Sequence, residues 1–181
     1  TPSNRLMCAS TTDDLQIWPG LLEKAYLYVL GGVYDFSGSN PAADLHLLLG
    51  WIPEHVPLRS RSGREAFKSE REWKRICEAW NKGGCLLTAG TTAAVESSAS
   101  ISSLDARRKL EPSHAYCVID VQQDEQGRRF ITLLNPWRVE RGEELRGICE
   151  RIITLTWEEA CANLGSLYLN WDPEVWSNRL A

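Results

Sequence analysis

Two strand-like runs joined by a short polar segment constrain this chain more than any other feature of its sequence. The runs cover residues 115–121 and 129–134, and the segment between them, 122–127, reads Gln-Gln-Asp-Glu-Gln-Gly. This pattern predicts an antiparallel hairpin, in which the position of the turn decides which residues face each other. With the turn centred near residue 125, we expect His114 at the start of one strand to stand beside Asn135 at the end of the other.

His114 and Asn135 are therefore the candidate site residues. Side chains alternate along a strand, so the imidazole and the carboxamide should project from the same face within hydrogen-bonding distance. With a thiol, they would form a Cys-His-Asn site, in which the imidazole takes the thiol proton and the amide fixes its tautomer. Trp137, two residues beyond Asn135, could cover their hydrogen bond if the strand continues. On geometry alone, a satisfied polar pair without a catalytic role is the more common explanation.

The rest of the chain predicts helices mixed with short strands. The helix expected over 41–49 has the clearest ends, because Asn40 can cap it, Pro41 can start it and Gly50 can stop it. We detect no internal repeat and no linker that divides residues 1–181, so we expect a single α+β domain with an antiparallel sheet and flanking helices. The other predicted elements are helices over 18–30, 64–82 and 157–164, strands over 85–89, 152–155 and 167–171, and a Ser/Thr-rich loop over 90–105.

Composition excludes several classes of function. Apolar residues make up 43% of the chain and charged residues 24%, which is typical of a globular protein, and the net charge of -4 would not attract nucleic acid or an anionic membrane. No apolar run approaches the roughly 20 residues that span a bilayer. Cysteines occupy positions 8, 77, 85, 117, 149 and 161 and form no CxxC pair, so we expect buried free thiols and neither a zinc ribbon nor a dithiol redox site. The lack of a signal peptide favours a cytoplasmic location, and we expect no metal or cofactor.

Several longer motifs resemble the calpain-type cysteine proteases. These motifs are Trp-Pro-Gly-Leu-Leu-Glu-Lys-Ala-Tyr at 18–26, Gly-Trp-Ile-Pro-Glu at 50–54, His-Ala-Tyr at 114–116 and Asn-Pro-Trp at 135–137. The segment Leu-Tyr-Leu-Asn-Trp-Asp-Pro at 167–173 is most similar to the fungal PalB-type calpain-like proteases of alkaline-pH signalling and to their animal relatives. The resemblance covers nearly the whole chain and implies the second subdomain of a papain-like catalytic core.

The resemblance also implies a role for each site residue. His114 would be the general base and acid, Asn135 would orient it, Trp137 would shield the pair, and the loop over 90–105 would gate the substrate cleft. The nucleophilic Cys and the oxyanion-hole Gln would lie upstream on the first subdomain, so residues 1–181 would be inactive alone. The parent would be an intracellular endopeptidase that cleaves regulatory proteins, with a protein substrate and an endosomal signalling complex as its partners.

Two departures from the family pattern and two other functions also need to be considered. Residues 31–34 contain one residue more than the family motif, and the segment between Trp137 and Trp157 is shorter than usual. That segment holds calcium ligands in typical calpains, so its shortness argues against a calcium site. A non-catalytic calpain-like scaffold and an unrelated Cys-His hydrolase, such as a transglutaminase-like domain, remain open alternatives. His46 and His55 are expected to be structural or exposed.

Overall fold

The computed structural model describes residues 9, 16–31, 38–58, 70–93, 110–136 and 152–177. The chain divides into two compact units, 1–39 and 40–181, a division that the sequence did not predict. The first unit holds helix α1 (Trp18–Val29), with Pro19 in its first turn. Within α1, only Gly20 and Leu27 are buried. Its exposed large apolar side chains, with those flanking it, are Ile17, Trp18, Leu21, Leu22, Tyr28, Val29 and Leu30.

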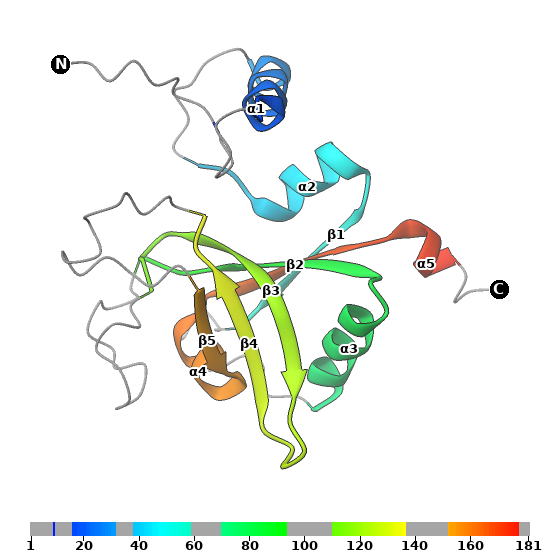
Figure 1. The fold of residues 1–181 in the computed structure, drawn as a ribbon, viewed down its shortest axis with the longest axis vertical. Coiled ribbons are helices and arrows are strands. Elements are labelled where there is room, and N and C mark those ends of the chain that lie inside the picture. Colours follow the sequence, from blue (N-terminus) through cyan, green and yellow to red (C-terminus); the bar gives the residue numbers. More distant parts are fainter. Residues whose placement is uncertain are drawn as a thin grey trace. The chain divides into compact units, whose positions relative to one another are not determined.

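The second unit is built on a six-stranded antiparallel sheet with the strand order β1-β6-β2-β3-β4-β5 (Figure 1). This arrangement confirms the predicted α+β class. Most strands lie where the sequence predicted them, because apolar side chains alternate along them and polar segments separate them. The strands are β1 (Ile52–Pro57), β2 (Cys85–Gly90), β3 (Ala115–Gln123), β4 (Arg129–Leu134), β5 (Ile152–Thr156) and β6 (Ser166–Trp171).

Among the described residues of this unit, four helices accompany the sheet: α2 (Pro41–Leu49), α3 (Glu70–Asn81), α4 (Trp157–Asn163) and α5 (Pro173–Ser177). The bounds of α2 match the prediction. Its Asn40 cap accepts a hydrogen bond from the Ala42 N–H at 2.9 Å, and Gly50 ends it with a left-handed φ of 74°. Thr156 and Glu159 start α4 with reciprocal side-chain to backbone hydrogen bonds. The sequence did not predict α5.

One face of the sheet carries the hydrophobic core. Alternate residues of the strands point into it, and Leu133, Leu155 and Leu169 are fully buried there. Helices α3 and α4 cover this face, and their Trp73 and Trp157 rings pack with centroids 4.9 Å apart. Each fully buried leucine contributes about 1.5–3 kcal/mol relative to an exposed one. Trp73 and Trp157 are thus core side chains.

Strand β1 was missing from the prediction. It contains Pro53 and Pro57, and proline lacks the N–H that a central strand donates. β1 lies at the end of the strand order and pairs only with β6 among the described strands, which is the position where proline is tolerated. On the face opposite the core, the buried Asn170 donates from its Nδ2 to the Ala42 carbonyl at 2.9 Å and so holds α2 against β6.

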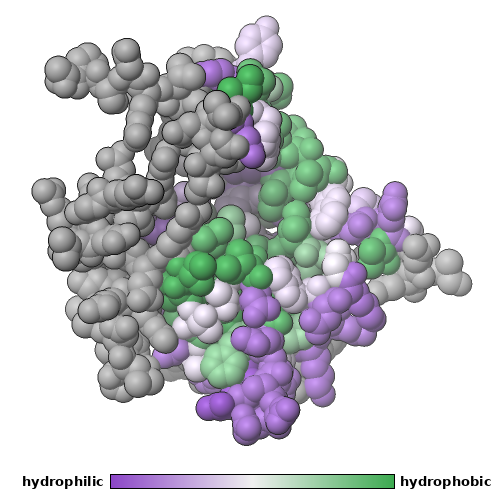
Figure 2. All heavy atoms as spheres, viewed as in Figure 1, coloured by the Kyte–Doolittle hydropathy of each residue, from purple (hydrophilic) through white to green (hydrophobic). Residues whose placement is uncertain are grey.

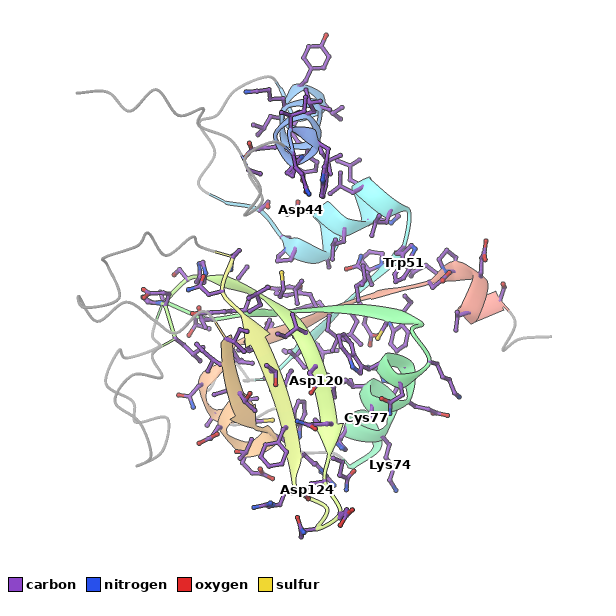
Figure 3. All side chains as sticks on the ribbon, in the orientation of Figure 1. Asp44, Trp51, Lys74, Cys77, Asp120 and Asp124 are labelled. Carbon is purple, nitrogen blue, oxygen red and sulfur yellow. The ribbon has the colours of Figure 1, made fainter. Side chains whose placement is uncertain are left out.

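The far end of the hairpin is polar and exposed. Asp124 accepts hydrogen bonds from the backbone N–H groups of Gln126 and Arg128 and from the Arg128 guanidinium. Hydrophilic side chains gather over this turn (Figure 2), and Figure 3 shows Asp124 at its base. The turn therefore closes as the sequence predicted, and the candidate site lies at the other end of the same two strands.

Candidate active site

His114 and Asn135 lie at the open end of the β3–β4 hairpin. The sequence predicted them directly opposite each other, but the register of the strands is different. Cys117 pairs with Leu134, so one further residue along brings Asn135 level with Tyr116. The register shift between Val118 and Asp120 reduces this offset by one residue, because the pairs nearer the turn would place Asn135 level with Cys117. The predicted register is therefore wrong by two residues. Because an even offset keeps both side chains on the same face, they become diagonal neighbours and still meet.

The two side chains form a hydrogen bond. Nε2 of His114 and Oδ1 of Asn135 are 2.9 Å apart, Asn135 is only 3% exposed, and His114 is half-buried. An amide oxygen only accepts hydrogen bonds, so the neutral imidazole must carry its proton on Nε2. Nδ1 then becomes the nitrogen that can take up a proton. Asn135 thus selects the tautomer and the ring plane of His114 without adding a charge.

Tyr116 supports the imidazole on the same face of β3. The rings of His114 and Tyr116 meet edge to face, with centroids 4.8 Å apart and planes at 88°. Tyr116 is 1% exposed, and its hydroxyl accepts the Glu111 N–H at 2.7 Å. We had assigned no role to Tyr116, although its two-residue spacing from His114 already placed both side chains on one face.

Thr91 holds the backbone of His114. The Thr91 N–H donates to the His114 carbonyl at 2.9 Å, and the Thr91 hydroxyl accepts the His114 N–H at 2.9 Å. The same hydroxyl donates to the Glu111 carbonyl at 2.6 Å. No local sequence signal could have found this contact, because 23 residues separate Thr91 from His114.

The described cysteines do not have the environment of a nucleophile. Cys117 is exposed, whereas we predicted a buried thiol. Its side chain is on the opposite face of β3 from Tyr116, and partial burial of the sulfur still raises the pKa of this thiol. Burial also raises the pKa of Cys85 to about 11, and that of Cys77, on α3 (Figure 3), to about 11. Cys161 is buried in the core. A nucleophilic cysteine needs a lowered pKa, so these thiols resemble the structural cysteines that we predicted.

The other two histidines have structural partners. The Nδ1 atom of His46 is 2.8 Å from the Trp51 carbonyl oxygen. His55 stacks on Tyr168, and its Nε2 is 2.7 Å from the Ser166 hydroxyl. Both findings agree with the expectation that these histidines are structural or exposed.

Several predictions fall outside the described residues. Trp137 is among these positions, as are most of the expected gating loop, Cys8, Cys149 and the segment 137–151. The expectation of no calcium site therefore stays a prediction. Within the described ranges, no three His, Cys, Asp or Glu side chains cluster closely enough to hold a metal ion. No helix in that part of the chain has the length and apolar character needed to cross a membrane.

Comparison with known proteins identifies the family. Residues 1–147 match the family model described as calpain family cysteine protease. The chain is 32% identical to Calpain-7 of Sus scrofa over 93% of its length, and 34% identical to the calpain-like protease palB/RIM13 of Cryptococcus neoformans over 89%. It is also 34% identical to the calpain-like protease palB/cpr-8 of Neurospora crassa over 90%. These alignments cover 22%, 16% and 18% of the respective relatives, so the chain spans about a fifth of their length. The chain belongs to the calpain family of cysteine proteases.

Proposed function

We propose that this chain supplies the proton-transferring half of a cysteine endopeptidase site. His114 is the general base and acid, and Asn135 orients it. The observation that carries the proposal is the 2.9 Å hydrogen bond from His114 Nε2 to a buried asparagine oxygen, which makes Nδ1 the proton acceptor. The family membership supports the same roles, since the motifs that contain both residues fall within the matched region.

The chemistry follows from this tautomer. Nδ1 takes the proton of a cysteine thiol, and the resulting thiolate attacks the peptide carbonyl carbon. The imidazolium, held in its plane by Asn135, then returns the proton to the leaving amine as the C–N bond breaks. In the second half of the reaction, Nδ1 accepts a proton from water as the water oxygen attacks the acyl carbon. The C–S bond then breaks, the acid product leaves, and the cysteine is regenerated as a thiolate beside the imidazolium. Trp137 would keep water away from the His114–Asn135 hydrogen bond.

The nucleophile is proposed to come from an upstream segment of the same parent protein, together with an oxyanion-hole glutamine. The raised pKa values of Cys77, Cys85 and Cys117 support this assignment, because none of these thiols is activated. Residues 1–181 alone are therefore expected to be inactive. By resemblance to the PalB-type proteins, we propose that the parent works in the cytoplasm, without a metal cofactor, and cleaves regulatory proteins at an endosomal signalling complex.

Peptide cleavage by the longer protein tests the proposal. His114→Ala should lower kcat by about 10²–10⁴-fold, the usual contribution of a general acid–base group. Asn135→Ala should lower kcat on the order of 10²-fold, because it releases the ring from its productive orientation. His55→Ala is the matched control, since this histidine also has a side-chain partner but lies on β1. If His114→Ala and His55→Ala cleave equally well, the chain is a non-catalytic scaffold instead.

A further inference from the structure

The segment that follows β2 runs beside the residues that precede His114. Beyond the bonds made by Thr91, the Ser113 N–H donates to the Thr92 carbonyl at 3.2 Å. Both polar groups of the His114 backbone are thereby engaged by a single threonine, through its N–H and through its hydroxyl. One hydroxyl group therefore supplies the acceptor for the His114 N–H.

The backbone next to His114 needs such an anchor. Ser113 has φ at 50°, in the left-handed region that residues other than glycine rarely adopt. A conformation of this kind persists only where the surrounding structure over-determines it. The bonds from Thr91 and Thr92 provide that determination on either side of the Ser113–His114 peptide.

The anchoring segment is itself held by Gly165, the residue before β6. The Gly165 N–H donates to the Gly90 carbonyl at 2.8 Å. A Cβ atom at Gly165 would lie 2.6 Å from the Cγ2 of Thr92, so only glycine lets the two segments approach this closely. The chain from Gly90 to Thr92 is therefore packed against Gly165, and a displacement of Thr91 would also disturb this contact.

We propose that Thr91 is a positioning residue, whose hydroxyl sets the backbone of His114 so that the ring reaches Asn135. This inference rests on the proposed function only for its kinetic consequence. Thr91→Val keeps the shape of the side chain but removes the acceptor of the His114 N–H and the donor to the Glu111 carbonyl. Thr91→Ser keeps both. The neighbouring Thr92→Val is the matched control, because Thr92 contacts Ser113 through its backbone carbonyl.

The first measurement is made on the 181-residue chain and does not depend on catalysis. The ring Nε2–H proton of His114 should be visible by NMR while it is hydrogen-bonded to Asn135, and Asn135→Ala identifies its signal. Thr91→Val should accelerate exchange of this proton with water at least tenfold, whereas Thr91→Ser and Thr92→Val should leave it within twofold. Should Thr91→Val not fold, Thr91→Ala removes the hydroxyl without placing a methyl group against the Glu111 carbonyl. An unchanged exchange rate in the valine or alanine variant would overturn the proposal.

Kinetics of the longer protein separate this inference from the function on which it rests. Thr91→Val should lower kcat tenfold or more and leave KM within twofold, and Thr91→Ser should restore kcat. If ring exchange accelerates while cleavage is unaffected, the positioning role stands and the catalytic role of His114 fails. If His114→Ala abolishes cleavage but Thr91→Val changes neither exchange nor kcat, the function stands and the positioning role fails.

Discussion

Glu54 should be the polar residue whose loss most weakens the packing of β1 against the sheet. Its carboxylate accepts two hydrogen bonds from Arg75 on α3, at 2.7 and 2.9 Å, and one from Nε1 of Trp171 on β6, at 2.7 Å. The Arg75 guanidinium also lies 5.3 Å from the centre of the Trp171 ring. One side chain thus links an edge strand, a helix and the neighbouring strand.

The expected cost of Glu54→Ala follows from these contacts. Trp171 is only 5% exposed, and the substitution removes the charged acceptor of its Nε1–H. This loss costs about 1.5–3 kcal/mol. The ion pair with Arg75 adds about 0.2–1 kcal/mol, because both side chains remain partly exposed. We therefore expect about 2–4 kcal/mol for Glu54→Ala. Glu54→Gln keeps an acceptor for Trp171 and should cost only about 1 kcal/mol.

The effect should depend on pH. Burial of the Glu54 carboxyl acts to raise its pKa, but the hydrogen bonds from Arg75 and Trp171 and the charge of Arg75 outweigh it, so the pKa lies below the usual 4.5. A depressed pKa stabilises the fold above pH 4.5, and this stability is lost as the pH falls through the lower folded-state value. The difference between wild type and Glu54→Gln should therefore shrink in that acid range.

Urea unfolding at pH 7 and through the acid range measures both quantities. Trp171→Phe is the matched background, since it removes the Nε1 donor and keeps an aromatic ring. In the Trp171→Phe protein, Glu54→Ala should cost less than about 1.5 kcal/mol. A cost below about 0.5 kcal/mol for Glu54→Ala in the wild-type background would refute the reasoning. Glu54 and Arg75 would then form an ordinary solvated surface pair.

Three further predictions concern the core, the thiols and the backbone beside the site. Ile131 is fully buried on β4, so Ile131→Ala should lower the free energy of unfolding by about 2–5 kcal/mol in urea, and a loss below about 1 kcal/mol would contradict the close packing. Among the described thiols, Cys117 should be alkylated first at pH 8 and Cys85 slowly, because Cys85 is buried and has a pKa of about 11. Peptide mapping by mass spectrometry checks this order, and equal alkylation rates for the two thiols would contradict it. Ser113→Gly should leave the thermal midpoint unchanged or raise it, whereas Ser113→Val should cost about 1–3 kcal/mol at its positive φ; equal midpoints for the two variants would contradict the strain.

Local sequence signals predicted those parts of the fold that local chemistry decides. Helix α2 begins and ends where predicted, because Asn40 caps its first turn and Gly50 takes a left-handed conformation after its last residue. The β3–β4 hairpin followed from alternating apolar residues and a polar turn closed by Asp124. From the turn position it was then possible to predict that His114 and Asn135 share a face, and this is the core of the candidate site.

Features that depend on the folded chain could not be predicted in this way. Strand β1 contains two prolines and is a strand because β6 pairs with it. The register shift next to Ile119 changes the pairing by one residue and leaves Asn135 level with Tyr116, two residues from the position expected opposite His114. Thr91 reaches His114 only after the sheet has formed, since the two residues lie on different strand ends. Tertiary pairing decides all three.

The central claim is that His114 activates a cysteine supplied from outside this chain. The most direct measurement is the rate at which an irreversible thiol-directed peptide inhibitor labels the longer protein. We expect one cysteine outside residues 1–181 to be labelled, His114→Ala to slow the labelling on the order of 10²-fold or more, and His55→Ala to leave it within about twofold. Labelling that is indifferent to His114, or no reactive cysteine outside this chain, would contradict the account and favour a non-catalytic scaffold.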